Sequence, residues 1–129
     1  MNNNDDTRKF TFPKRERLTS RKTIQRLFSE GKSFAMPPLR VFYLPQPDPD
    51  ISNHQLLFSV PKRAFKKAVD RNRVKRLMRE SFRLNKKELE QITHPYCIGY
   101  IYMFNTLPAF ELVQEKLRKS FKRLKKEIM

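Results

Sequence analysis

The chain has 129 residues and carries 29 Lys and Arg against 13 Asp and Glu, a formal net charge of +16. That length fits one domain, and 12% aromatic residues are too many for a disordered tail. We expect no secretory signal, and no apolar run approaches the roughly 20 residues that span a bilayer. The single cysteine excludes an internal disulfide. We therefore expect a cytoplasmic protein that binds a polyanion, nucleic acid rather than a membrane.

The first half of the chain predicts one helix and two strands after a disordered segment, residues 1–11. A helix is expected over Ser20–Glu30, with Gly31 as its carboxyl-terminal stop. The segments Leu39–Leu44 and His54–Val60 are short and rich in strand-forming residues. The proline-rich segment between them predicts a hairpin loop.

The second half predicts two amphipathic helices around one strand. The first helix covers Ala68–Asn85 and the second covers Leu107–Glu127, with Pro108 in its first turn. The strand Tyr96–Phe104 is almost continuously apolar, which indicates burial on both faces at the centre of a sheet. This order of elements predicts an α+β sandwich with helices packed on a mixed sheet.

The basic residues are concentrated in blocks, and the most informative block lies on the helix expected over Ala68–Asn85. Twelve of the 29 fall in Lys62–Lys87, although Val74, Leu77, Met78, Ser81 and Phe82 keep an apolar stripe. A rigid helix that presents guanidinium groups at helical spacing can bind successive phosphates. The charge excess is one-sided, so we expect nucleic-acid contact rather than a solvated face.

The aromatic residues supply a second candidate feature. In Leu39–Leu44, Phe42 lies on the opposite face from Val41 and Tyr43, so one face of this strand is expected to look away from the core. An aromatic ring on an exposed sheet face can stack an unpaired base, which is typically worth about 1–3 kcal/mol.

Signals for catalysis by the chain itself are weak. His54 and His94 are isolated, and Cys97 sits in an apolar strand without an evident partner. Asp48 and Asp50 could suggest a metal-dependent nuclease, but they lie in a proline-rich loop and are expected to be solvated. No zinc spacing and no glycine-rich phosphate loop is present. We predict no catalytic residue and no metal ligand in this chain.

The segment Ser59–Arg83, SVPKRAFKKAVDRNRVKRLMRESFR, resembles the central part of the bacterial ribonuclease P protein family. In that family a strand ends in Ser/Thr-Val-x-Lys-Lys/Arg, and a helix with the pattern Arg-Asn-Arg-x-Lys-Arg follows. The matching positions here are Ser59-Val60, Lys62-Arg63, Ala68, Arg71-Asn72-Arg73, Lys75-Arg76, Arg79-Glu80 and Phe82. Arg17–Phe34 resembles the family's first helix and the turn after it, so the similarity extends from Phe12 to the end of the chain.

The resemblance implies an α-β-β-β-α-β-α two-layer sandwich, with a mixed central sheet and a left-handed βαβ crossover. This is the arrangement of the second domain of ribosomal protein S5. It requires one strand more than the residues alone predict, and we expect that strand around Lys32–Met36. Residues 12–129 would then form a single RNA-binding domain.

The resemblance also implies a function as the protein subunit of ribonuclease P. The RNA subunit would use Mg²⁺, not bound by the protein, to remove the 5′ leader from precursor tRNA. The protein would bind both RNAs, with no membrane and no obligate protein partner. The implied RNA-binding residues are Lys62, Arg63, Arg71, Asn72, Arg73, Lys75, Arg76, Arg79 and Arg83. The implied leader-binding cleft contains Ile24, Phe28, Phe42 and Ser59, and Ile24 stands where many members have Phe.

Three other functions stay open from the sequence. The first alternative is a structural RNA-binding protein of the ribosomal type with no role in cleavage. A protein-only endonuclease would depend on Asp48 or Asp50. A DNA-binding factor would place the second helix in a major groove.

Overall fold

The computed structural model describes residues 12–129, and the prediction for residues 1–11 lies outside them. The first half contains the 3-10 turn η1 (Lys14–Glu16), helix α2 (Arg21–Glu30) and strands β1 (Lys32–Met36), β2 (Leu39–Pro45) and β3 (Gln55–Ser59). The second half contains α3 (Ala68–Asn85), α4 (Lys87–Glu90), β4 (Tyr96–Tyr102) and α5 (Phe110–Ile128). The strand expected around Lys32–Met36 is therefore present as β1. The short elements η1 and α4 are additions that the sequence did not predict.

The strands form one mixed sheet in the order β1-β2-β4-β3. β1 pairs with β2 and β2 pairs with β4 in antiparallel fashion, whereas β3 and β4 are parallel. The predicted hairpin between β2 and β3 is wrong, because β4 lies between these two strands. The apolar β4 gains burial on both faces at the centre, as predicted, and this central position separates β2 from β3.

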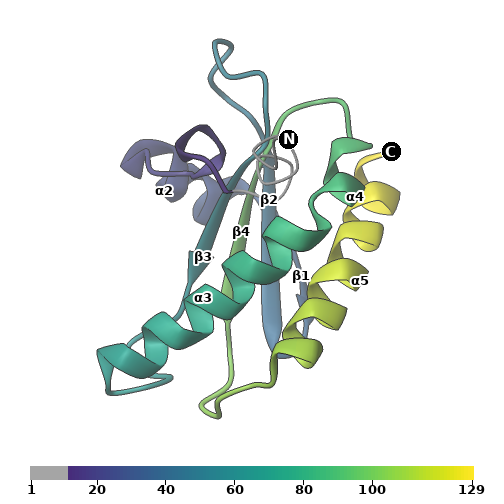
Figure 1. Cartoon of the computed structure of the whole chain (residues 1–129). Coiled ribbons are helices and arrows are strands. Elements are labelled where there is room, and N and C mark those ends of the chain that lie inside the picture. Colours follow the sequence, from purple (N-terminus) through teal and green to yellow (C-terminus); the bar gives the residue numbers. More distant parts are fainter. Residues whose placement is uncertain (1–11) are drawn as a thin grey trace, which may run out of the picture.

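The parallel strands β3 and β4 are joined across one face of the sheet by α3 and α4. In Figure 1 both strands run down the picture, α3 crosses in front of them, and β4 lies to the right of β3. This geometry makes the crossover left-handed, as the resemblance implied. The specific likeness to the second domain of ribosomal protein S5 stays a prediction.

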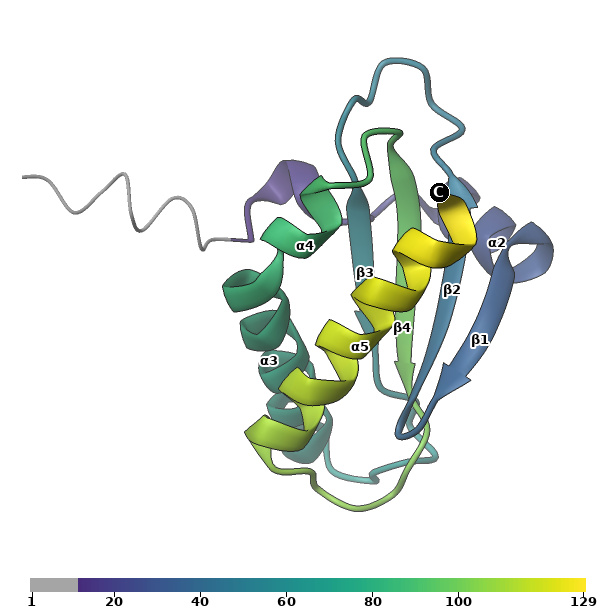
Figure 2. The same cartoon turned by 90° about the vertical axis from the view of Figure 1, so that its right-hand side faces the viewer.

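Helices cover the two faces of the sheet unequally (Figure 2). α3 and α5 pack on one face over the larger core, which includes Phe58, Phe82, Tyr100 and Phe121. α2 packs on the other face over a smaller cluster, formed by Leu18, Leu27, Leu44 and Cys97. We call this second side of the sheet the α2 face. Its strand residues are Ser33, Ala35, Arg40, Phe42, Leu44, Gln55, Leu57, Ser59, Cys97, Gly99 and Ile101.

Local contacts explain where two helices begin and end. Ser20 caps α2 through its hydroxyl, which accepts the Thr23 amide at 3.3 Å. The helix ends at Gly31, which turns to an extended conformation, and glycine is required there because a Cβ atom would lie 2.4 Å from the Leu27 carbonyl oxygen. The predicted start of the last helix is wrong, because α5 begins at Phe110 and Pro108 lies before it.

Candidate nucleic-acid interface

Helix α3 separates its apolar and basic residues as the sequence predicted. Val74, Met78, Ser81 and Phe82 are buried against the sheet and α5, and Leu77 is half-buried. Six of the nine predicted RNA-binding residues are exposed, and the other three are half-buried. The exposed ones are Lys62, Arg63, Asn72, Arg73, Arg76 and Arg79, and the half-buried ones are Arg71, Lys75 and Arg83.

Two of these nine side chains are engaged within the protein. The Arg71 guanidinium donates to the carbonyl oxygens of Phe65 at 2.7 Å and Lys66 at 3.0 Å, so it holds the loop that leads into α3. Arg83 forms an ion pair with Glu80, which lowers the pKa of that carboxyl. The other seven side chains make no hydrogen bond or ion pair with residues 12–129. They are available to a ligand.

One flank of α3 lies beside the amino-terminal segment. The Phe82 ring contacts Phe12, with centroids 5.1 Å apart, and also Phe121 of α5, with centroids 6.4 Å apart. Phe12 in turn contacts Phe58 of the edge strand β3. Lys75 and Arg79 precede Phe82 by seven and three residues on the same ridge of the helix.

The aromatic pair of the predicted leader site comes together on the α2 face. The rings of Phe28 and Phe42 meet edge to face, with their centroids 4.9 Å apart, and both residues are half-buried. Gly99 pairs with Phe42 in the sheet, and a Cβ atom there would lie 3.0 Å from Leu27 and 3.5 Å from the Phe28 ring. Gly99 therefore permits the close approach of α2 and places Phe28 beside Phe42. The sequence analysis did not use Gly99, but as the one glycine inside a predicted strand it could have indicated this close approach.

The other two predicted leader residues lie on either side of this pair. Ile24 packs against the cluster below α2 and lines a shallow hollow on the helix with Phe28. Ser59 lies on the α2 face one row further along the sheet, where it pairs with Ile101. The structure thus brings Ile24, Phe28 and Phe42 into one neighbourhood and leaves Ser59 at its margin.

The titratable residues singled out in the sequence occupy structural or solvated positions. Cys97 is fully buried, and burial raises the pKa of its thiol to about 11. Asp48 and Asp50 are exposed in the loop after β2, where the Asp48 carboxylate accepts the Asp50 amide at 2.9 Å. No three His, Cys, Asp or Glu of residues 12–129 gather into a group that could hold a metal ion. Within this range no helix is long and apolar enough to cross a membrane.

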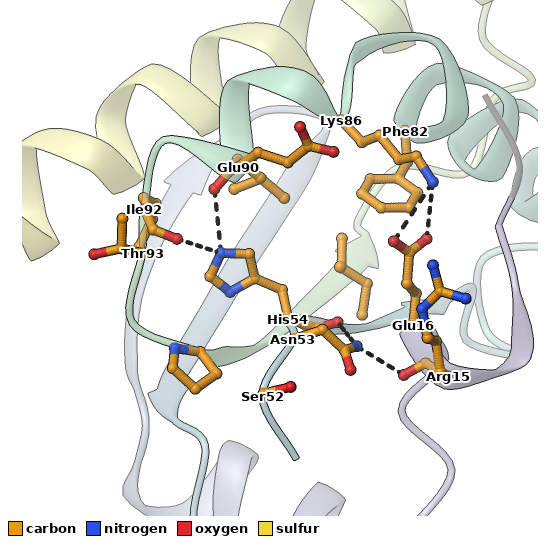
Figure 3. Close-up of a pocket in the computed structure, with 13 residues that line it drawn as sticks. Arg15, Glu16, Ser52, Asn53, His54, Phe82, Lys86, Glu90, Ile92 and Thr93 are labelled. Carbon is orange, nitrogen blue, oxygen red and sulfur yellow. Dashed lines mark hydrogen bonds and ion pairs between the residues drawn. The ribbon is translucent and has the colours of Figure 1, made fainter. Parts of the chain in front are cut away.

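A cavity of about 350 Å³ lies between η1, α4 and the segment before β3 (Figure 3). His54 sits at its edge, and its Nε2 donates to the carbonyl oxygens of Ile92 at 2.9 Å and Leu89 at 3.1 Å. Its Nδ1 accepts the Tyr96 amide at 3.0 Å. His54 therefore joins α4 to the start of β4 and has a structural role.

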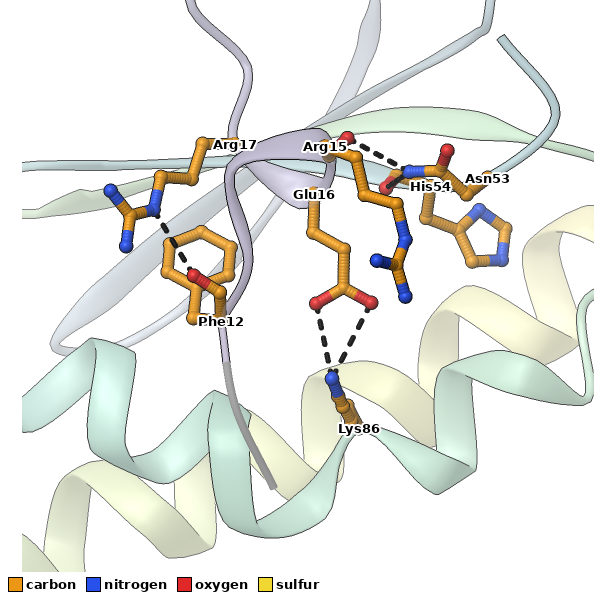
Figure 4. A network of polar contacts seen from close by, with 7 residues as sticks. All are labelled: Phe12, Arg15, Glu16, Arg17, Asn53, His54 and Lys86. Carbon is orange, nitrogen blue, oxygen red and sulfur yellow. Dashed lines mark hydrogen bonds and ion pairs between the residues drawn. The ribbon is translucent and has the colours of Figure 1, made fainter. Parts of the chain in front are cut away.

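The opposite wall of this cavity holds a polar network that anchors the amino-terminal segment (Figure 4). Lys86 is 8% exposed and pairs with both oxygens of Glu16, at 3.1 and 3.4 Å. Asn53 donates to the Arg15 carbonyl oxygen at 2.9 Å, and Arg17 donates to that of Phe12 at 3.1 Å. These contacts fix η1 beside the end of α3, and we assign the network to the fold rather than to RNA binding.

Comparison with known proteins identifies the family of this chain. A family model described as Ribonuclease P matches residues 12–128. The ribonuclease P protein component of Porphyromonas gingivalis is 39% identical over 119 residues, which cover 89% of this chain and 87% of that protein. That of Chlorobium phaeobacteroides is 33% identical, over 81% of each chain.

Solved structures show the same arrangement of elements. The ribonuclease P protein from Thermotoga maritima aligns with a TM-score of 0.69 at 29% identity, over 84% of this chain and 96% of that one. The Staphylococcus aureus protein aligns with a TM-score of 0.70 at 23% identity, which supports the fold alone. With a family model that spans the whole described domain, the chain belongs to the ribonuclease P protein family, the protein component of the tRNA-processing endoribonuclease.

Proposed function

We propose that this protein promotes removal of the 5′ leader from precursor tRNA by holding the ribonuclease P RNA on α3 and the leader on the α2 face. The observation that carries the proposal is the set of seven polar and basic side chains on α3 and the loop before it. They have no protein partner among the described residues, and most of them are exposed. A helix with this much unpaired charge is suited to phosphates.

We assign the hydrolytic chemistry to the RNA subunit and its Mg²⁺. In this proposal the protein binds and positions the two RNAs, and the RNA subunit carries out the hydrolysis. Its contribution is electrostatic, because the RNA subunit and the substrate are both polyanions that repel each other. A protein of net charge +16 reduces this repulsion and lowers the Mg²⁺ concentration that the complex needs.

The Phe28–Phe42 pair is the proposed contact for unpaired leader bases. In holoenzyme reconstituted with its RNA subunit, we expect Phe28→Ala or Phe42→Ala to lower the affinity for precursor tRNA about tenfold, because base stacking is worth roughly 1–3 kcal/mol. Affinity for mature tRNA, which has no leader, should not change. Phe104→Ala is the matched control, because Phe104 is 46% exposed in the loop before α5.

Measured dissociation constants for precursor and mature tRNA decide between the outcomes. Equal losses on both substrates would show that these rings stabilise the protein rather than contact the leader. A structural ribosomal-type role predicts a different result, in which the wild-type protein binds RNA but does not accelerate leader removal at low Mg²⁺.

A further inference from the structure

Arg40 gives the α2 face a cation that its neighbours hold in position. Its guanidinium donates to the Ser33 hydroxyl at 3.1 Å and lies 5.8 Å from the centre of the Phe42 ring. Leu39 and Val41, on either side of it, point into the larger core, so Arg40 shares the α2 face with Phe42. The side chain is nevertheless exposed, so a ligand can reach it.

Arg40 forms no ion pair with an Asp or Glu of residues 12–129. The four strands of the described sheet include no Asp or Glu, and Lys32 and Arg40 are their only cations. In the sheet register, Arg40 pairs with Ile101, and Ile101 pairs with Ser59. This row lies next to the row of Phe42 and Gly99, over which α2 packs, and Ile101 and Ser59 are half-buried.

The row therefore presents an apolar centre with a cation on the β2 side and a hydroxyl on the β3 side. Neighbouring strands are about 4.8 Å apart, so Arg40 on β2 and Ser59 on β3 are separated by roughly 10 Å. Lys62 and Arg63 lie three and four residues after Ser59, in the loop that follows β3, and have no protein partner among the described residues. A single strand of RNA has the complementary chemistry, because its bases have apolar faces and its phosphates are anionic.

We propose that Arg40 binds a backbone phosphate of the single-stranded 5′ leader at a nucleotide whose base lies over Phe42 and Ile101. The inference rests on the proposed function of the α2 face as the leader site. It adds a phosphate contact on the β2 side, opposite the cations that follow β3. The leader would then be held between cations on two sides rather than by the aromatic pair alone.

A binding assay tests this contact. The full chain is titrated into a fluorescent single-stranded RNA hexanucleotide, and binding is followed by fluorescence anisotropy at salt concentrations from about 50 to about 300 mM. We expect Arg40→Ala to weaken binding about fivefold and to reduce the slope of log K against log[salt] by about 0.7, the value for one phosphate. Arg40→Gln keeps a donor for Ser33 but removes the charge, and it should reduce the slope equally. Lys32→Ala is the matched control, because Lys32 is exposed but pairs with Tyr43, whose side chain points to the other face.

The same variants in reconstituted holoenzyme separate this inference from the proposed function. We expect the Arg40 variants to lose affinity for precursor tRNA and to keep that for mature tRNA, while Lys32→Ala changes neither. If the wild-type holoenzyme does not prefer precursor over mature tRNA, the proposed function of the α2 face fails. If that preference exists and the Arg40 variants match Lys32→Ala in both assays, the phosphate contact is overturned and the proposed function stands.

Discussion

Single residues in this protein divide into those that hold the fold and those left available to RNA. The sequence pattern assigns Arg71 to RNA binding, but in the structure two carbonyl oxygens of the loop before α3 accept from its guanidinium. The Arg-Asn-Arg motif therefore presents Asn72 and Arg73 to solvent, while Arg71 fixes the loop that carries Lys62 and Arg63. We infer that substitution of Arg71 would disturb this loop as well as any RNA contact.

His54 is predicted to contribute to stability through three hydrogen bonds to the backbone. His54→Ala removes them and deprives the Tyr96 amide and the Ile92 carbonyl oxygen of this partner, while the Leu89 carbonyl oxygen still accepts the Ile92 amide. We expect the free energy of unfolding, measured by urea denaturation, to fall by about 2 kcal/mol. His94→Ala is the control, because His94 is exposed and is expected to change stability by less than about 0.5 kcal/mol. Equal effects of the two substitutions would contradict this role.

Cys97 is predicted to be unreactive in the folded protein. Its thiol is buried, and burial raises its pKa from 9.0 to about 11. At pH 8 the thiolate population is then about a hundredfold lower than for an unshifted thiol, because each unit of pKa changes it tenfold. The unfolded chain deprotonates at a lower pH than the native one, so the free energy of unfolding should decrease as the pH rises from about 9 to 11.

Alkylation by iodoacetamide, followed by mass spectrometry, measures the reactivity of Cys97 directly. We expect slow labelling of the native protein at pH 8 and fast labelling in concentrated guanidinium chloride. Labelling of the native protein at the rate of the unfolded chain would show that the thiol is accessible and ionised.

At the scale of elements, the position of α2 depends on Gly99 in the central strand. Gly99→Val would place methyl groups against Leu27 and Phe28, where even a Cβ atom is 3.0 Å from its neighbour. We expect a loss of about 1–3 kcal/mol in the free energy of unfolding, together with weaker binding of precursor tRNA as Phe28 moves.

The control for this substitution lies one residue earlier in the same strand. Ile98→Val also changes a β4 residue, but its side chain points into the larger core and away from α2, and the change should cost about 1 kcal/mol. If Gly99→Val binds precursor tRNA as well as Ile98→Val does, the placement of Phe28 by this glycine is wrong.

The elements that the sequence predicted well are those whose signal is local. The 3.6-residue periodicity of α3 and α5 and the apolar run of β4 each identify their element within a short window. The pairing of β2 was predicted wrongly because its partner β4 lies about fifty residues away, and no local pattern distinguishes it from the nearer β3. The resemblance to a family supplied β1, which the residues alone did not indicate.

The candidate site shows the same division between local and long-range signals. The charge on α3 is visible in the sequence, because one helix contains it. The contact between Phe28 and Phe42, and the row that joins Arg40 to Ser59, depend on sheet register and on the packing of α2. The sequence therefore does not predict a role for Arg40, because it is an isolated cation between two apolar residues.

At the scale of the whole molecule, some charged side chains form ion pairs within the fold and others are exposed at the surface without a partner among the described residues. Two ion pairs join acidic groups to cations that hold helices together, Glu16 with Lys86 and Glu88 with Lys125. Seven polar and basic side chains of α3 and of the loop before it have no partner among the described residues, and this loop joins the end of β3 to α3. The α3 surface and the α2 face lie on opposite sides of the sheet, an arrangement suited to a protein that contacts two RNAs.

Leader removal from precursor tRNA by the reconstituted holoenzyme at low Mg²⁺ tests the central claim most directly. The comparison uses wild-type protein, the double variant Arg73→Ala with Arg76→Ala, and a control with equal charge loss on α5, Arg118→Ala with Lys122→Ala; all four residues are exposed. We predict that the α3 variant lowers the cleavage rate at least about tenfold, with recovery at high Mg²⁺, whereas the α5 variant stays near the wild type. Equal rates for the two double variants would contradict a specific RNA-docking role for α3.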